Sequence, residues 1–379
     1  MDALNFSISF EQYLLPDGQL AKPFRGADFP SEKILDAYRL MRLIRSFDQK
    51  AIALQRTGKL GTYPSILGQE AIGVAIGHAM EQEDIFAPYY RDIATQYLRG
   101  VSFTEILLYW GGSERGSDYK NCPRDFPICV PIATQLGHAA GAAVALKLEA
   151  SHHAALVTCG EGATSKGDFL ETLNLAGAWQ LPLVIVVNNN QWAISTPRRI
   201  QCGAESIAQK AIGAGIPGVV VDGNDYFAVY AEVHKALKKA RAGKGASLIE
   251  AQSYRLGDHT TADDASRYRS EDELKQAWVK EPITRLQAYI ERELGWTKQQ
   301  ESAMQAEHDK LIRQSVETYL ATPAEQPEAM LEHLYEKLPD CLMDQYAELK
   351  SIGVLQRFPL SGSQPSGDQP KDDHHKLGA

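Results

Sequence analysis

The stretch Ala154–Thr196 reads AALVTCGEGATSKGDFLETLNLAGAWQLPLVIVVNNNQWAIST. It contains two short apolar runs, Ala154–Cys159 and Leu183–Val187, with a helix-like segment between them. A strand, a glycine-rich turn, a helix and a second strand form a βαβ unit, so we expect two parallel strands that end at the same edge of a sheet. That edge is where open α/β sheets bind ligands.

Each of these two strands is followed by a residue that can bind a cation. Glu161 lies between two glycines after the first strand, and Asn190 ends a run of asparagines after the second. Carboxylate and amide oxygens without Cys or His suit Mg²⁺ or Ca²⁺ rather than Zn²⁺. The small residues Gly162 and Ala163 let a phosphate approach the backbone at a helix N-terminus, where free N–H groups favour an anion. The stretch therefore predicts a metal site beside a phosphate site.

The rest of the chain continues the alternation of strands and helices. Strands are predicted over 84–87, 218–222 and 247–251, which indicates an α/β fold with one mostly parallel sheet flanked by helices. We expect a surface arm over 1–29, the α/β domain with a helical C-terminal part over 30–345, and a tail over 346–379 that is disordered from about 360.

Helix starts are predicted from capping residues. Ser31 is expected to cap a long helix, and Ser165 with Asp168 forms an acidic variant of the capping box in the βαβ unit. The pair Gln69-Glu70 reads only as the start of another helix.

Composition limits the possible partners. The chain has 379 residues and a net charge of −9, and no basic patch dominates, which argues against nucleic acid. Its five cysteines form no CxxC pair, which favours a reducing compartment over a disulfide framework or a zinc site. The sequence shows no secretory signal and no apolar run of about 18 residues, so we expect a cytoplasmic protein without a membrane span.

Several separated motifs resemble one known family. Gly160-Glu161-Gly162 with Asn189-Asn190 resembles the thiamine diphosphate motif usually written GDG…NN. The flanking residues 162–168 and 190–196 resemble the alpha subunit of the first, decarboxylating component of the 2-oxo acid dehydrogenase complexes. Tyr90-Arg91 and the loop around His259 match the same family, so the resemblance implies a thiamine-diphosphate-binding fold from about Ser31 to Met343.

The resemblance assigns cofactor roles to individual residues. It implies thiamine diphosphate and Mg²⁺, with the cation held by Glu161, Asn190 and the backbone carbonyl of Trp192. The other residues that it implies for the cofactor site are Tyr90, Arg91, Val130, Ile132, Gly162, Ala163 and His259. In some members a structural K⁺ lies at the positions of Thr134 and Gln135.

The same resemblance implies a role for the long polar loop after residue 253. His259 matches a catalytic histidine that contacts the diphosphate and assists acyl transfer to lipoyl, and a pKa near neutrality would suit that step. The residues that match those ordering this loop for the lipoyl domain of the acyltransferase are Arg255, Asp263, Tyr268 and Arg269.

The implied activity is oxidative decarboxylation of a small 2-oxo acid. The ylide carbon of the cofactor attacks the keto carbon, carbon dioxide leaves, and the acyl group passes to lipoyl. In enzymes of this cofactor a Glu on a second α/β domain activates the pyrimidine ring, and this chain holds only one sheet's worth of strands. The resemblance therefore implies a beta subunit in an α2β2 heterotetramer, and we expect the chain alone to be inactive.

Three positions depart from the common pattern of the family. Glu161 replaces the more frequent Asp, and its longer side chain still reaches a metal. Asn188 stands where some members have a diphosphate-binding Arg, which places more weight on Arg91 and the cation. Thr260 stands where some members carry a regulatory phosphoserine, so we predict no phosphorylation there.

The sequence leaves alternatives open. Residues 61–63 and 68–71 resemble pyruvate enzymes and favour pyruvate, whereas 261–264 and 190–192 resemble branched-chain enzymes. A nicotinamide-dependent dehydrogenase is a more distant alternative, since the chain lacks a full GxGxxG. A non-catalytic scaffold subunit is a third, against which the intact Glu161, Asn190 and His259 argue.

Overall fold

The computed structural model of the chain describes residues 6–24, 29–332 and 334–351. The chain divides into two compact units, Met1–Pro323 and Ala324–Ala379. The second unit contains α13 (Ala329–Glu332), the 3₁₀ turn η5 (Asp340–Leu342) and α14 (Met343–Ser351). This division falls earlier than the predicted domain boundary at residue 345, and the tail predicted to be disordered from about 360 lies outside the described residues.

Within the described residues, six strands form one sheet in which each neighbouring pair is parallel. In spatial order the strands are β1 (Ser9–Glu11), β7 (Gly218–Asp222), β8 (Ser247–Gln252), β4 (Leu183–Asn189), β3 (Ala155–Gly160) and β2 (Ile85–Ala87). The predicted α/β class, the βαβ unit and its parallel strands are confirmed. All carboxyl ends therefore lie at one edge of the sheet.

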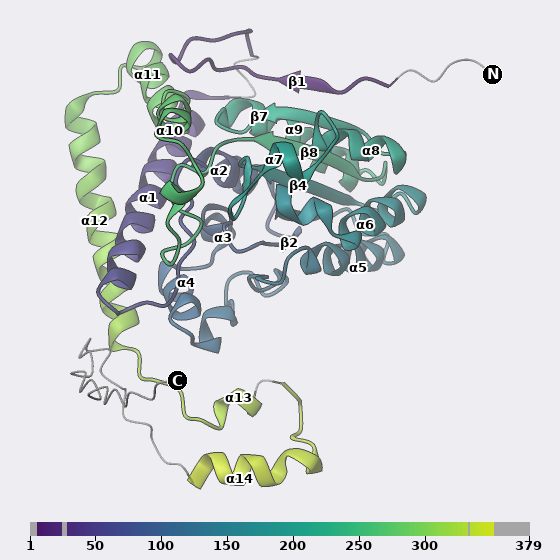
Figure 1. Cartoon of the computed structure of the whole chain (residues 1–379), viewed down its shortest axis with the longest axis vertical. Coiled ribbons are helices and arrows are strands. Elements are labelled where there is room, and N and C mark those ends of the chain that lie inside the picture. Colours follow the sequence, from purple (N-terminus) through teal and green to yellow (C-terminus); the bar gives the residue numbers. More distant parts are fainter. Residues whose placement is uncertain (1–5, 25–28, 333, 352–379) are drawn as a thin grey trace, which may run out of the picture. The chain divides into compact units, whose positions relative to one another are not determined.

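Helices cover both faces of the sheet because its strands are apolar on both sides. Leu156 and Val184 belong to one apolar core, whereas Val157 and Ile185 belong to the other, as the alternation along a strand requires. The first core is covered by α1 (Ser31–Arg56), α2 (Glu70–Ala79), α3 (Ile93–Arg99) and α9 (Tyr226–Arg241). The second is covered by α5 (Thr134–Leu148), α6 (Gly167–Ala178) and α8 (Lys210–Gly213) (Figure 1).

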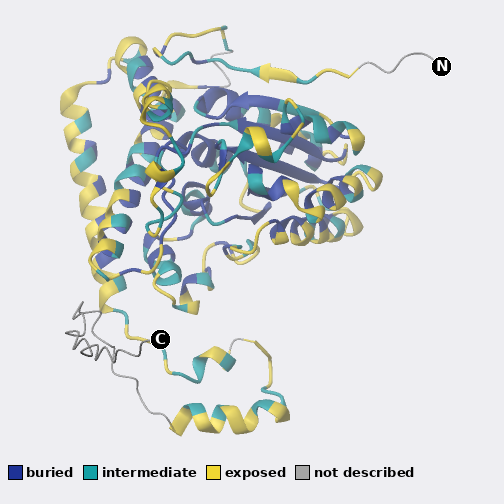
Figure 2. Cartoon of the chain, in the orientation of Figure 1, coloured by how far each residue is buried: buried dark blue, intermediate teal, exposed yellow. Residues whose placement is uncertain are grey.

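The predicted helical C-terminal part is present and packs beside α1. It consists of α10 (Glu271–Trp278), α11 (Pro282–Leu294) and α12 (Lys298–Ala321), and α12 lies along α1 and α4 (Phe103–Trp110). Figure 2 shows buried strands at the centre and an exposed outer side of α12. The remaining short elements are β5 (Trp192–Ala193), β6 (Thr196–Pro197), α7 (Arg198–Gln201), η1 (Glu114–Ser117), η2 (Glu161–Ser165), η3 (Ile207–Gln209) and η4 (Ala265–Arg267).

Of the predicted surface arm over 1–29, residues 1–5 and 25–28 lie outside the described residues, and the described part contains β1, which pairs with β7 at the edge of the sheet. Three residues are too few to show a periodicity, so the sequence does not indicate this strand. The arm is held by Asp225, whose carboxylate accepts hydrogen bonds from the backbone N–H groups of Tyr13 (2.6 Å) and Leu14 (2.8 Å). A contact across more than 200 positions therefore fixes it.

Two predicted caps are wrong. Ser31 is the first helical residue of α1, and the cap position belongs to Pro30, which accepts no side-chain bond. Ser165 closes the 3₁₀ turn η2, so that α6 begins at Gly167 with Lys166 as its cap. Tertiary packing of the turn after β3 overrides the local capping pattern in this case.

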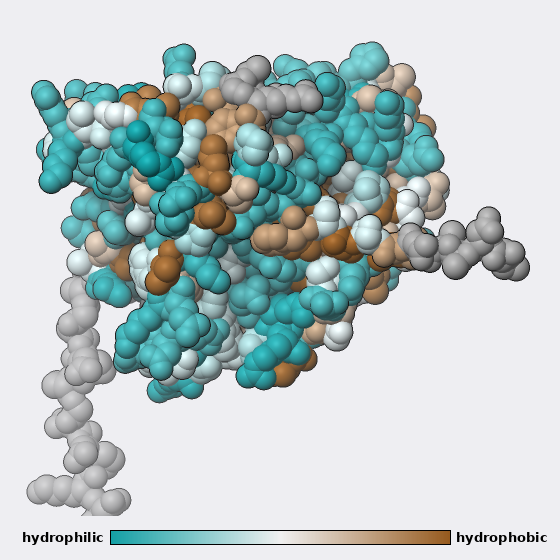
Figure 3. Space-filling model, turned by 90° about the horizontal axis from the view of Figure 1, so that it is seen from above, coloured by the Kyte–Doolittle hydropathy of each residue, from teal (hydrophilic) through white to brown (hydrophobic). Residues whose placement is uncertain are grey.

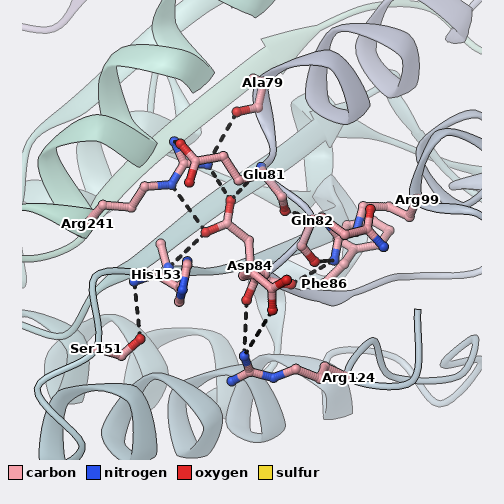
Figure 4. A network of polar contacts seen from close by, with 12 residues as sticks. Ala79, Glu81, Gln82, Asp84, Phe86, Arg99, Arg124, Ser151, His153 and Arg241 are labelled. Atoms are coloured by element: carbon pink, nitrogen blue, oxygen red, sulfur yellow. Dashed lines mark hydrogen bonds and ion pairs between the residues drawn. The ribbon is translucent and has the colours of Figure 1, made fainter. Parts of the chain in front are cut away.

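A buried polar network fixes the start of β2, at the end of the strands away from their carboxyl edge (Figure 4). Asp84 is fully buried and pairs with the guanidinium group of Arg241 at the end of α9. Its carboxylate also accepts the backbone N–H of Ala154 at 2.9 Å, and its own carbonyl accepts from Arg99 of α3 at 2.6 Å. The network thereby joins β2, β3 and the two helices.

Hydrophilic side chains cover most of the face shown in Figure 3, with smaller apolar areas among them. Among the described helices, none is both long enough and apolar enough to cross a bilayer.

Candidate active site

A cavity lies at the carboxyl ends of β3 and β4, the edge that the sequence predicts for ligand binding. Its lining includes nine of the predicted cofactor or metal residues: Tyr90, Arg91, Val130, Ile132, Glu161, Gly162, Ala163, Asn190 and Trp192. His259 is not among the lining residues, but its ring contacts Arg91. Residues from separated segments of the chain thus meet at one site.

Glu161 and Asn190 lie side by side, as the parallel pairing of β3 and β4 requires. The backbone N–H of Asn190 donates to Glu161 Oε2 at 3.2 Å, and the two residues are 1% and 4% exposed. Burial raises the pKa of the Glu161 carboxyl, against hydrogen bonds and two arginines that lower it. The second oxygen, Oε1, is buried and has no hydrogen-bond partner in the described structure.

Trp192 completes a set of oxygen atoms suited to a hard cation. Its backbone N–H donates to Asn190 Oδ1 at 3.3 Å, and its carbonyl accepts from Arg255 at 3.2 Å. The turn is tight, because Gln191 adopts the left-handed conformation with φ of 72°. The carboxylate, amide and carbonyl oxygens match Mg²⁺ chemistry. The described residues contain no cluster of three His, Cys, Asp or Glu side chains for another metal.

The small residues after Glu161 allow a close approach of two backbone segments. A Cβ atom added at Gly162 would lie 2.8 Å from Cβ of Ala193, so only glycine fits beside this turn. Residues Glu161–Ser165 form the 3₁₀ turn η2, not the first turn of α6 as predicted. The backbone N–H groups offered to an anion are therefore those of a short turn.

Arg91 and Arg255 fix the tautomer of His259. Arg91 Nη2 lies 3.0 Å and Arg255 Nη1 lies 3.3 Å from Nδ1 of His259. Because a guanidinium group only donates, Nδ1 is the acceptor and the proton of the neutral ring is on Nε2. Burial, together with these two cations, lowers the pKa of His259 to about 3. In the chain without ligands this pKa lies well below the near-neutral value that would suit proton transfer.

The four predicted loop residues form one network around His259. Arg255 donates to the hydroxyl of Tyr268 at 2.6 Å and to the carbonyl of Ile194 at 2.8 Å. Asp263 accepts from the Tyr268 hydroxyl and from the backbone N–H of His259 at 2.8 Å. Arg269 donates to the backbone carbonyls of Arg255 and Gly257. The network connects the loop to the turn after β4.

The remaining predicted positions differ in environment. Val130 and Ile132 are 48% and 46% exposed at the rim, and the Tyr90 ring packs edge-on against His259. Gln135 is buried and donates to the carbonyl of Thr158 at 2.8 Å, whereas Thr134 is exposed. One of these two residues is thus buried and the other exposed, and the K⁺ site stays a prediction.

Gln69 is a site residue that the sequence does not indicate. Its side-chain oxygen accepts from the amides of Asn188 (2.8 Å) and Asn190 (3.1 Å). Asn188 also donates to the Tyr89 hydroxyl at 2.8 Å and so belongs to this amide cluster, while its correspondence to a diphosphate-binding Arg in some members stays a prediction. The contact between Gln69 and Asn190 spans 121 positions, so no local pattern predicts it.

Comparison with known proteins relates the chain to one family. The family model described as "Dehydrogenase E1 component" matches residues 38–328. The pyruvate dehydrogenase E1 component subunit alpha of Acholeplasma laidlawii is 38% identical over 85% of this chain and 94% of its own length. The proteins of the same name from Staphylococcus aureus (strain Mu50) and Mycoplasma pneumoniae are 36% and 35% identical, over 88% of this chain and 91% and 93% of theirs. The chain therefore belongs to the dehydrogenase E1 component family.

Proposed function

We propose that the chain is the alpha subunit of a pyruvate dehydrogenase, which decarboxylates pyruvate oxidatively and transfers the acetyl group to a lipoyl group. The observation that carries the proposal is the buried, unpartnered Oε1 of Glu161 beside Asn190, within the described residues. A buried carboxylate oxygen without a donor is costly unless a cation binds to it. The names of the most similar relatives support pyruvate as the substrate.

Membership of the family implies thiamine diphosphate as cofactor. When bound, this cofactor supplies the nucleophilic carbon and the electron sink for decarboxylation. Glu161, Asn190 and the Trp192 carbonyl would hold Mg²⁺, and Arg91 and Tyr90 would bind the diphosphate. The buried Arg91 guanidinium is already oriented by the carbonyl of Ser65 at 2.6 Å, which reduces the entropy lost on binding an anion.

His259 would act as a hydrogen-bond donor through Nε2. Its neutral ring can donate that proton to an oxygen of the substrate or of the diphosphate without a prior protonation step. A bound diphosphate would offset the positive charge of Arg91 and Arg255, and so raise the pKa of His259 from the low value in the ligand-free chain. Proton transfer in acyl transfer would then depend on cofactor binding.

The proposal includes two protein partners. A beta subunit would cover the apolar rim formed by Val130, Ile132 and Ile194, each about half exposed. Exclusion of water at this rim would strengthen the electrostatic interactions inside the cavity. The loop network of Arg255, Asp263, Tyr268 and Arg269 would present His259 to the lipoyl domain. We also propose the α2β2 assembly and the cytoplasmic location that the sequence predicts.

The decisive experiment is co-expression with the beta subunit, followed by assay of the purified complex. We expect lipoyl-linked decarboxylation with pyruvate as the best substrate, and no activity of the alpha chain alone. A higher specificity constant for branched-chain 2-oxo acids would contradict the proposal that pyruvate is the substrate. Full activity of the isolated chain would contradict the requirement for a beta subunit. Residues 261–264 and 190–192 resemble branched-chain enzymes, but the names of the similar relatives refer to pyruvate, so neither the branched-chain nor the nicotinamide-dependent alternative is better supported.

A further inference from the structure

Gln69 accepts a hydrogen bond from the amide nitrogen of Asn190 at 3.1 Å. An amide side chain presents either an oxygen or an NH₂ group, and only the oxygen can bind a metal. We propose that Gln69 is a positioning residue that orients the Asn190 amide for metal binding. This inference rests on the proposed function, because it concerns the same cation.

The orientation of the Asn190 amide follows from a backbone donor. The N–H of Trp192 can only donate, and it lies 3.3 Å from Asn190 Oδ1. The NH₂ group of Asn190 therefore points the other way, toward Gln69 at 3.1 Å. If the amide were flipped, the NH₂ group would meet this N–H group, and a donor would face the cation beside Glu161.

The orientation of Gln69 is fixed in turn by its own surroundings. Its Oε1 also accepts from Asn188, whose other amide atom accepts from the hydroxyl of Ser253 at 2.9 Å. Gln69 is 3% exposed, and its Nε2 has no partner among the described residues. An unpaired buried N–H group costs free energy. A flip of the Gln69 amide would turn its NH₂ group toward these two asparagine donors and leave the nitrogen unpaired as well, so the oxygen faces the asparagines.

The backbone around Gln69 places this oxygen within reach. Gly68 has φ of +90°, and a Cβ atom there would lie 2.7 Å from the carbonyl of Tyr254. Glu70 anchors the start of α2 through Arg45 (2.7 Å) and the N–H of Gly68 (3.0 Å). The segment Gly68–Glu70 thus has a glycine that permits the turn, a glutamine that holds the asparagines and a glutamate that fixes the helix.

The test is a Mg²⁺ titration of the complex with the beta subunit at saturating thiamine diphosphate. Tryptophan fluorescence is the signal that reports Mg²⁺ binding. Gln69→Met removes the acceptor at similar size, and we expect the Mg²⁺ concentration for half-saturation to rise about tenfold or more. Gln96→Met is the matched control, because Gln96 is also buried (2%) with one unpartnered amide atom among the described residues. It should leave half-saturation unchanged.

The same substitution made in a protein that already carries Asn190→Asp separates the loss of amide orientation from a general structural effect. Asn190→Asp has an oxygen in both positions, so Gln69→Met should no longer change half-saturation there. An equal effect in both backgrounds, or none in the wild type, would overturn the inference. If Gln69→Met does not fold, two other variants replace it. Gln69→Glu keeps the acceptor and Gln69→Lys does not. Half-saturation at the same Mg²⁺ concentration for these two variants would overturn the inference. Absence of any Mg²⁺-dependent binding by the wild type would instead overturn the proposed function.

Discussion

Replacing Glu161 by glutamine should have opposite effects on the protein with and without its cofactor. The substitution keeps the size of the side chain and an acceptor for the N–H of Asn190, but it removes a buried negative charge. Burial raises the pKa of this carboxyl, so its ionised form is destabilised in the ligand-free protein. We therefore expect the melting temperature of ligand-free Glu161→Gln to equal or exceed that of the wild type.

With Mg²⁺ and thiamine diphosphate bound, the wild type should have the higher melting temperature. At about 100 times its dissociation constant a ligand stabilises the wild type by about 2.7 kcal/mol. Loss of a metal ligand weakens binding by about a hundredfold or more, which leaves about 0.4 kcal/mol at the same concentration. Since about 1 kcal/mol corresponds to about 2 °C for a chain of this size, the cofactor-induced shift should fall from about 5 °C to about 1 °C.

The assay is thermal unfolding of wild type and variant, each with and without the two ligands. Glu171→Gln is the control, because Glu171 is an exposed residue of α6, the helix that follows the turn containing Glu161. It should show the full cofactor-induced shift. A full shift in Glu161→Gln would refute the assignment of the cation to this carboxylate.

Three further predictions concern stability and pH. Arg99→Met breaks an ion pair with Asp125 in which both side chains are 3% exposed, and it should lower the free energy of unfolding by about 3–5 kcal/mol in urea titrations; a change near zero would contradict this. Asp225→Ala leaves three backbone N–H groups without their acceptor and should cost about 3 kcal/mol, with earlier proteolysis of the N-terminal arm as the specific readout. Because the pKa of His259 is lowered in the folded chain, the folded loop is fully stable above the unfolded pKa of about 6.5 and loses stability as pH falls toward about 3. Amide exchange of 258–269 in the cofactor-free protein, corrected for intrinsic rates, should be less protected at about pH 5 than at about pH 7, and His259→Asn should remove that difference.

Local pattern and chain topology were sufficient to predict five of the six described strands and the proximity of Glu161 to Asn190. The strands β3 and β4 are short apolar runs with a helix between them, and a right-handed crossover makes such strands parallel. This alone brings Glu161 and Asn190 together, because parallel strands end at one edge. The motifs around Tyr90 and His259 then indicate the family without any knowledge of coordinates.

Other features were decided only by contacts between distant segments. Three residues of β1 join the sheet because Asp225 holds the arm. The tautomer and the low pKa of His259 depend on two arginines, one of which, Arg91, comes from a segment 168 positions away. The role of Gln69 likewise depends on asparagines that lie more than 100 positions further along the chain. Spacing along a chain predicts which residues share a strand end or a helix face, but hydrogen-bond orientation and pKa are properties of the packed environment, which exists only after folding.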